Sequence, residues 1–223
     1  MSISLLVLLA MHVLGDFYFQ SDKLALRKRQ EITSVFIHSL LYTIAFLPMV
    51  FISSWYVFLI LVLSHAVIDF LKYVLMHVTA RNSVLFTLDQ LGHIAVLAGV
   101  SVWALPDFPM EIRYVSALRI IVLVLWVAKP VSVLFSELFG RFRPLPGEGT
   151  EGAGKVIGYL ERLMLVLLLI IGQYGVIGWV IAAKTLARSK QLSDSQAFCE
   201  YFLVGTLFSI LSTISLFLVL YRW

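Results

Sequence analysis

Residues 55–77 read WYVFLILVLSHAVIDFLKYVLMH, an apolar segment that nevertheless carries His65, Asp69 and Lys72. A hydrocarbon core of about 30 Å needs roughly 20 predominantly apolar residues in a helix. Residues four positions apart lie on one face of a helix, so His65 and Asp69 present an imidazole and a carboxylate to a common point. Ionisable groups are expensive inside a membrane and by default mark a functional site. The segment therefore predicts a transmembrane helix that carries part of a buried site.

The rest of the chain repeats this apolar character. Of its 223 residues, 61% are hydrophobic and 13% are charged, whereas a soluble domain has about 45–50% apolar and about 25% charged residues. We therefore predict an all-α fold, a polytopic transmembrane bundle of about seven spans. Besides residues 55–77, the predicted spans are 2–20, 34–52, 83–105, 114–136, 157–183 and 200–221.

A segment rich in proline and glycine interrupts the apolar pattern. Residues 140–155 contain Pro144, Pro146 and five glycines, a composition typical of a flexible loop without a core of its own. We predict three parts: an N-terminal transmembrane bundle with the His/Asp pairs (1–139), a flexible cytoplasmic loop (140–155), and C-terminal transmembrane helices that pack on the same bundle (156–223).

Basic residues set the expected orientation. The formal net charge of +4 does not indicate nucleic-acid binding, because basic residues in a membrane protein mainly determine topology. The densest basic cluster follows the first predicted span, so this connection is expected to be cytoplasmic. Its basic residues are Lys23, Arg27, Lys28 and Arg29.

The basic residues Lys184, Arg188 and Lys190 disagree with this orientation, because seven spans would place them outside the cell. Either this stretch folds back into the bundle, or the number of spans differs by one. An ion pair between Glu200 and Lys184 or Arg188 would explain how these residues escape the rule.

Two further His–Asp pairs have the same spacing as the pair in residues 55–77. His12 and Asp16 lie in the first predicted span, and Asp89 and His93, in reversed order, lie in the fourth. The expected topology places all three pairs in the cytoplasmic half of the membrane, within roughly 15 Å of depth at about 1.5 Å per residue. This shared depth favours a single buried polar site.

Imidazole and carboxylate are the ligands of zinc, and of iron or manganese at oxygen-richer sites. Helical bundles hold such metals with side chains that project inward from facing helices. We predict a divalent metal, with zinc as first choice and iron or manganese as alternatives. The predicted ligands are His12, Asp16, His65, Asp69, Asp89 and His93, of which Asp16, Asp69 and Asp89 are the predicted catalytic groups. The residues expected around the metal or substrate are Gln20, His38, Lys72, Gln90, Glu161, Arg162, Lys184, Arg188 and Glu200, with His38 as either a further ligand or a hydrogen-bond partner of one.

The same residues suit two other roles. His–Asp pairs four residues apart neutralise one another, and buried polar groups can hold a membrane bundle together. A proton or ion pathway also uses these residue types. His77, at the end of the third predicted span, is expected to lie at the interface and not to bind metal.

Several motifs resemble the bacterial membrane family catalogued as domain of unknown function 3307, over essentially the whole length. The resemblance rests on His12-Val-Leu-Gly-Asp16-Phe-Tyr-Phe-Gln20, on His65, Asp69 and Lys72, on Asp89-Gln90 with His93, on Gly154-Lys-Val-Ile-Gly158-Tyr-Leu-Glu161-Arg162, on Ala183-Lys184 with Arg188, and on Glu200-Tyr201 with Gly205-Thr206 and Ser209. Thr185 stands where the family pattern tends to have Ser. The resemblance implies a multi-pass protein of the bacterial inner (cytoplasmic) membrane, and it carries no established activity.

More loosely, the early His/Asp-rich helices are similar to inner-membrane metal-dependent hydrolases, which is an analogy of site. We therefore expect a metal-dependent hydrolase that cleaves a lipid or membrane-delivered ester or phosphoester near the cytoplasmic side, with Lys72 or Arg162 holding an anionic group. The alternatives are an ion- or proton-coupled transporter or sensor, or a membrane subunit of a larger complex. The expected partners are membrane lipid and this substrate, without nucleic acid, and a homo-oligomer is compatible with the pattern.

Overall fold

The computed structural model describes residues 1–79, 82–105, 110–144 and 152–221, and the described residues form helices without a strand. The all-α prediction is confirmed. The chain divides into two compact units, Met1–Val122 and Leu123–Trp223, with the division inside helix α7 (Ile112–Phe139). Part of the predicted loop, residues 145–151, lies outside the described residues.

Four helices of the described chain are long and apolar enough to cross a membrane. They are α5 (Trp55–Val78), α6 (Asn82–Trp103), α7 with the short helical turn after it (Ile112–Phe142) and α11 (Gln196–Tyr221). They match the predicted spans 55–77, 83–105, 114–136 and 200–221. The chain therefore carries the helices of a membrane protein, whereas the count of about seven spans is not confirmed.

Two other predicted spans form shorter helices. For residues 2–20, the structure has α1 (Ile3–Val13) and the π-helical turn η1 (Leu14–Tyr18). For residues 34–52, it has α3 (Ile32–Phe46) and the single turn α4 (Met49–Ile52). Pro48 separates α3 from α4, because proline has no N–H to donate to the preceding turn and its ring crowds that turn.

The prediction of one span over residues 157–183 is wrong. The structure has a hairpin of α8 (Ala153–Ile170) and α9 (Tyr174–Ala187), which pack against each other. Gly172 lies at the turn with φ of 73°, a left-handed conformation that glycine adopts without steric cost. Because α9 returns along α8, Lys184 reaches Glu161 at 2.7 Å.

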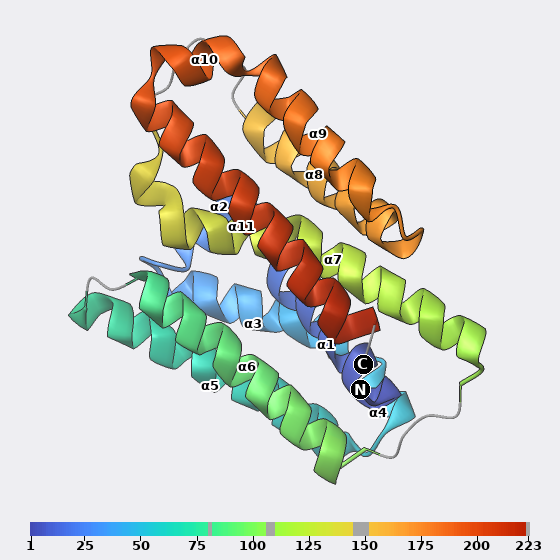
Figure 1. Ribbon diagram of the computed structural model, residues 1–223. Coiled ribbons are helices and arrows are strands. Elements are labelled where there is room, and N and C mark those ends of the chain that lie inside the picture. Colours follow the sequence, from blue (N-terminus) through green and yellow to red (C-terminus); the bar gives the residue numbers. More distant parts are fainter. Residues whose placement is uncertain (80–81, 106–109, 145–151, 222–223) are drawn as a thin grey trace. The chain divides into compact units, whose positions relative to one another are not determined.

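The first unit contains a four-helix bundle. Helix α5 packs against α3 and α6, and α1 packs against the same two helices from the other side of the ring. Figure 1 shows α5 and α6 side by side as a hairpin. Such a bundle can build a polar site in its core from side chains on facing helices.

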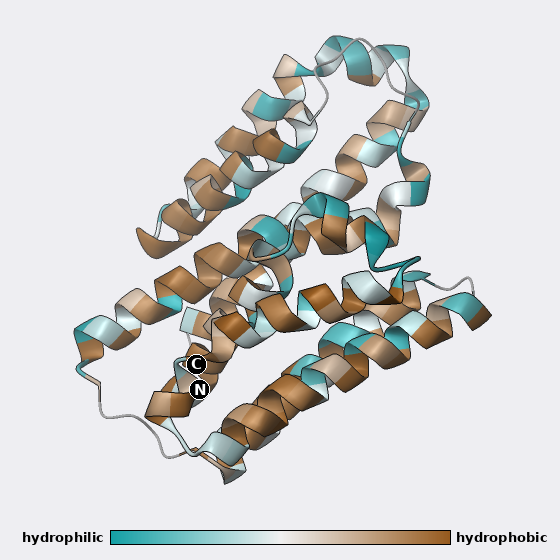
Figure 2. Cartoon of the chain, turned by 180° about the vertical axis from the view of Figure 1, so that it is seen from behind, coloured by the Kyte–Doolittle hydropathy of each residue, from teal (hydrophilic) through white to brown (hydrophobic). Residues whose placement is uncertain are grey.

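The bundle core has an apolar layer and a polar layer. Leu6, Phe46, Leu61 and Leu97, one from each helix, are at most 2% exposed. The polar residues lie toward the other ends of the same helices, and Figure 2 shows hydrophilic residues concentrated in the half of the α5–α6 hairpin nearest its turn. This agrees with the expectation that the polar groups share one half of the helices' length.

The second unit is built around the α8–α9 hairpin and α11. Leu165, Leu168 and Leu169 of α8 form its core with Ile177 of α9, and residues of α11 pack against this cluster. Gly205 of α11 lies against Phe135 of α7, and a Cβ added there would be 3.3 Å from the ring. Two short helices, α2 (Asp22–Arg27) in the first unit and α10 (Ser189–Asp194) in the second, complete the described elements.

Candidate metal centre

All three His–Asp pairs meet in the core of the four-helix bundle, together with His38. Each of the seven side chains is buried, with no more than 5% of any residue exposed. The π-helical turn and α1 carry one pair, α5 the second and α6 the third, while α3 contributes His38. The cluster residues are His12, Asp16, His38, His65, Asp69, Asp89 and His93.

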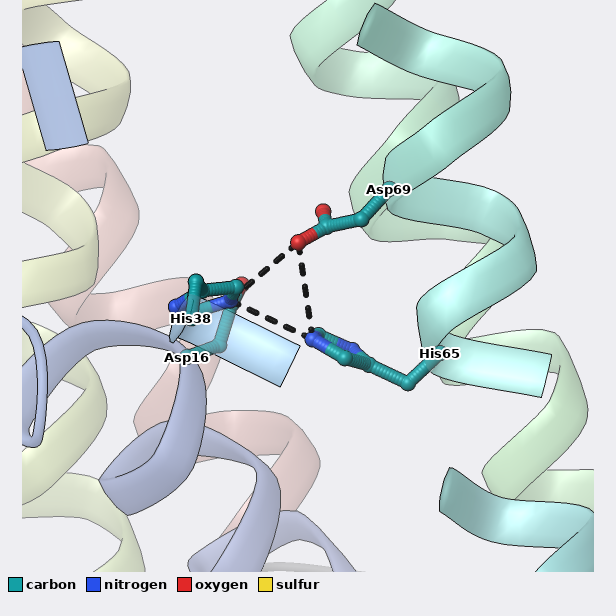
Figure 3. A group of neighbouring side chains, drawn as sticks. All are labelled: Asp16, His38, His65 and Asp69. Atoms are coloured by element: carbon teal, nitrogen blue, oxygen red, sulfur yellow. Dashed lines mark hydrogen bonds and ion pairs between the residues drawn. The ribbon is translucent and has the colours of Figure 1, made fainter. Parts of the chain in front are cut away.

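Four of these residues face one another closely (Figure 3). The Nε2 atom of His38 lies 3.0 Å from Oδ1 of Asp16, 3.2 Å from Oδ2 of Asp69 and 3.2 Å from Nε2 of His65. The Nε2 of His65 is 3.6 Å from the same Asp69 oxygen. We call Asp16, His38, His65 and Asp69 the quartet; it is one of the groups whose donor atoms are close enough to share a metal ion.

Hydrogen bonding alone does not account for the quartet. A neutral imidazole nitrogen has either one hydrogen or one lone pair. His38 Nε2 faces two carboxylate oxygens and a second imidazole nitrogen, so a single N–H can serve only one of the three. A cation between the four atoms would satisfy all of them at once, because each can offer it a lone pair.

Two more groups adjoin the quartet and share residues with it. One is His12, Asp16 and His93, and the other is Asp69, Asp89 and His93; within each group the donor atoms lie within 4.8 Å of one another. The cluster is therefore continuous across the bundle, with Asp16 and Asp69 belonging to two groups each.

The π-helical turn places Asp16 against α3. A π turn widens the helix by one residue per hydrogen-bonded loop, and such turns are frequent at functional sites. Gly15 permits the close approach, because a Cβ there would lie 2.8 Å from Cδ2 of Tyr42 and 3.1 Å from Cβ of Ala45. Asp16 thereby comes within hydrogen-bond distance of His38.

Two lysines neutralise part of the cluster's charge. The Nζ of Lys28 lies 2.8 Å from Oδ2 of Asp69, and the Nζ of Lys72 lies 2.8 Å from Oδ2 of Asp89. The cluster has three carboxylates and two bonded ammonium groups. If its imidazoles are neutral, the cluster therefore has a net charge of one negative unit. A buried, uncompensated charge is strongly unfavourable.

Glutamine side chains orient the carboxylates. Gln90 donates to Oδ2 of Asp16 at 2.7 Å and to Oδ2 of Asp89 at 3.1 Å. Gln20 donates to the backbone carbonyl of Asp16. Hydrogen bonds of this kind fix the orientation of metal-binding carboxylates. The structure therefore places Gln20, Gln90 and Lys72 beside the cluster.

Sequence reasoning missed Tyr42 and Lys28. Tyr42 stacks on the His65 ring with centroids 3.4 Å apart, and its hydroxyl lies 3.3 Å from Nδ1 of His12. Its position four residues after His38 was a usable signal, because both then share one face of α3. The sequence explains Lys28 by membrane topology alone. Lys28 and Asp69 are 41 residues apart, so local spacing does not predict their contact.

The other predicted site residues belong to the second unit and make contacts within it. Glu161 pairs with Lys184, Arg188 donates to Gln191 at 2.8 Å, and Glu200 accepts from Gln196 at 2.9 Å. The predicted pairing of Glu200 with Lys184 or Arg188 is wrong, because the α8–α9 hairpin brings Glu161 closer to Lys184.

Arg162 of the second unit is 4% exposed and donates to the backbone carbonyls of Val127 and Ala128 in α7. Its Nη1 also lies 3.4 Å from the hydroxyl of Ser209 in α11. The guanidinium therefore joins three helices of its own unit.

The sequence over residues 4–126 matches the family described as "Protein of unknown function (DUF3307)". The chain belongs to this family. The matched region covers more than half of the chain and contains the whole His/Asp cluster, whereas the resemblance predicted for residues 154–209 lies beyond it. No curated protein and no solved structure matches the chain.

Proposed function

We propose that this DUF3307 protein is a membrane-embedded metal-dependent hydrolase whose metal ion is held by the quartet Asp16, His38, His65 and Asp69. The crowding of three acceptor or donor atoms around the single Nε2 of His38 carries the proposal. A divalent cation removes this conflict, and it also neutralises the negative charge that Lys28 and Lys72 leave over.

The spacing of the quartet supports a small ion. Zinc bonds imidazole nitrogen and carboxylate oxygen at about 2.0–2.2 Å, so tetrahedral ligands lie roughly 3.3–3.6 Å apart. Four of the six separations among the quartet are 3.0, 3.2, 3.2 and 3.6 Å, and all four donor atoms lie within 4.8 Å of one another. Two nitrogens and two oxygens suit zinc, with iron or manganese as the alternatives.

A bound metal would polarise an ester or phosphoester and lower the pKa of a bound water to about 7. Lys28 and Lys72 are suited to steady an anionic group of the substrate, since their ammonium groups lie at the cluster carboxylates. Lys28 also belongs to the basic cluster that is expected to be cytoplasmic. The proposed substrate is therefore a lipid or membrane-delivered ester that reaches the centre from the inner side of a bacterial inner membrane.

Elemental analysis of the full-length protein, purified in detergent without chelators, tests the metal centre. We expect at least one zinc, iron or manganese ion per wild-type chain and its loss in His65→Ala. His77→Ala is the matched control, because His77 is exposed and its hydrogen bond and ring contact both go to Tyr73 of its own helix. Metal-free wild-type protein with a normal helical circular-dichroism spectrum would contradict the proposal.

Hydrolysis is measured separately on metal-loaded protein. Phosphatidylcholine vesicles that contain phosphatidic acid report phosphoester cleavage through released phosphate, and the same vesicles report carboxylic ester cleavage through released fatty acid. We expect one of the two products, lost on metal removal and restored by adding the metal back. Metal-loaded protein that releases neither product would leave a metal centre without the proposed hydrolase activity.

A second candidate function is proton or ion transfer through the bundle. The rings of His38, His65, His93 and His12 follow one another with centroid separations of 5.2, 4.4 and 5.2 Å. A series of imidazoles is suited to a relay. Ion or proton flux in liposomes that disappears in Asp69→Asn, with metal-free protein equally active, would favour this function over hydrolysis.

A further inference from the structure

His93 of α6 has no assigned role in the quartet, yet it is 2% exposed. Neither of its ring nitrogens has a hydrogen-bond partner among the described residues. Leaving a buried polar atom without a partner costs free energy, and such atoms in folded proteins call for an explanation. The unpartnered imidazole points to a ligand beyond the quartet.

Two carboxylate oxygens of the residues grouped with His93 are in the same condition. Asp89 binds Lys72 and Gln90 through Oδ2, whereas its Oδ1 has no hydrogen-bond partner in the described chain and lies 3.9 Å from Nδ1 of His93. Asp69 contacts Lys28 and the quartet histidines through Oδ2, while its Oδ1 is likewise buried without a hydrogen-bond partner there. Each carboxylate therefore has one oxygen engaged and one available.

We propose that Asp69, Asp89 and His93 hold a second metal ion beside the first, with Asp69 bridging the two ions through its two oxygens. This inference rests on the proposed metal centre. The donor atoms of the three residues lie within 4.8 Å of one another, and a bridging carboxylate joins metal ions about 3.5–4 Å apart in two-metal hydrolytic sites. One ion thus accounts for three residues with unpartnered buried atoms.

The two ions have different surroundings. The quartet supplies four protein ligands, so its ion would take up water only by expanding to five-coordinate. The second ion has three protein ligands and keeps positions open for water and substrate, as catalytic sites do. The second ion is therefore the more open of the two to substrate, and both ions would act in the proposed hydrolysis. Two divalent ions also make the cluster positively charged, which selects an anionic substrate and favours a phosphoester over a neutral ester.

Metal stoichiometry tests the second site. Full-length protein stripped of metal is titrated with Zn²⁺ and its bound zinc is measured after desalting. We expect two ions per wild-type chain and one in Asp89→Asn, because the quartet does not use Asp89. Asp194→Asn is the matched control: the same substitution at an exposed position of α10 leaves both ions.

A spectroscopic measurement on the unmodified protein makes the result independent of how the variants fold. Two Mn²⁺ ions bridged by Asp69 are expected to give an exchange-coupled electron paramagnetic resonance spectrum. Asp89→Asn is expected to give the six-line spectrum of an isolated ion instead.

The outcomes separate the two proposals. One ion per wild-type chain, unchanged in Asp89→Asn and with an uncoupled manganese spectrum, overturns the second site and leaves the proposed quartet centre standing. No bound ion in the wild-type chain overturns both. Loss of the second ion in His12→Ala but not in Asp89→Asn overturns the ligand assignment, because it selects the neighbouring group of His12, Asp16 and His93.

Discussion

The two units of this protein bury charged groups in opposite ways. In the second unit, Arg162 donates to the carbonyls of Val127 and Ala128 and lies over the ring of Tyr159 at 5.5 Å. In the first unit, His38 Nε2 meets three atoms that one hydrogen cannot serve. Burial of a charged group is therefore not by itself the sign of a ligand site. What indicates a ligand site is a buried atom with more potential hydrogen-bond partners than its hydrogen or lone pair can serve.

The chain around Arg162 explains why a guanidinium is suitable there. Pro130 lies inside α7, two and three residues after the carbonyls that Arg162 bonds, and its ring crowds the preceding turn of the helix. Gly158 leaves space for the group, since a Cβ there would lie 3.2 Å from Nη1 of Arg162. Arg162 thus links α8 to α7 and α11, and these contacts explain its burial without a ligand.

The largest expected effect tests the excess of partners around His38 Nε2. His38→Ala removes the atom at the centre of the quartet, and we expect zinc affinity to fall by at least about 100-fold, because loss of a direct ligand should exceed the 10–100-fold typical of outer hydrogen-bond partners. The affinity is measured by competition with a chelator, with His77→Ala as the control. An unchanged affinity would mean that His38 only supports the true ligands.

Arg162→Met tests the other half of the comparison. Two backbone carbonyls lose a charged donor, at about 1–3 kcal/mol each, partly offset because a charge is no longer buried. We expect a net loss of about 2 kcal/mol of unfolding free energy, measured by denaturation in detergent, with metal content unchanged. Exposed Arg113→Met is the control. Loss of metal in Arg162→Met would instead place Arg162 beside the metal, as the sequence predicted.

Gly15→Ala tests how the fold positions the quartet. The added Cβ would lie 2.8 Å from Tyr42 and 3.1 Å from Ala45, so η1 must move away from α3 and take Asp16 with it. We expect zinc affinity to fall about 10-fold, the low end of the effect of disturbed ligand orientation. Gly99→Ala in α6 is the matched control, because its Cβ would meet nothing within 4 Å; an equal effect of both substitutions would rule out the proposed role of Gly15.

Much of the first unit could be predicted from the sequence, because the relevant signal is local. The spacing of four between His65 and Asp69, or between Asp89 and His93, fixes which residues share a helix face. That local rule led to the six paired residues that the structure brings together. It could not rank His38 above His12 as a quartet member, because this depends on how α3 packs against α5.

The second unit was harder to predict, because its decisive feature is a break in an apolar run. Residues 157–183 have the length and composition of one long span, and a single Gly172 in a left-handed conformation turns them into a hairpin. A glycine within an apolar segment is common in membrane helices, so its type alone does not predict a turn. The contact of Lys28 with Asp69 could not be predicted for a similar reason. A basic residue after a membrane span is already expected from the positive-inside rule, so Lys28 did not stand out as a site residue.

The smallest expected effect concerns the ion pair that joins the α8–α9 hairpin. The side chains of Lys184 and Glu161 are 23% and 19% exposed, and the Nζ of Lys184 also lies 4.8 Å from the centroid of the Phe202 ring. Partly exposed pairs contribute little, because solvation competes with the attraction. We expect a coupling free energy below about 1 kcal/mol in a double-mutant cycle of Lys184→Met and Glu161→Gln, measured by denaturation in detergent.

The size of this coupling also tests the environment of the hairpin. If the start of α8 and the end of α9 lie at the membrane surface, as the basic residues after Lys184 indicate, water screens the pair and the coupling stays small. A coupling above about 2 kcal/mol would show that the pair is shielded from water. The second unit would then hold an ion pair in an apolar environment, as the first unit does with Lys28 and Asp69. The two units would then differ only in whether the buried group has matched hydrogen-bond partners, as Arg162 has and His38 has not.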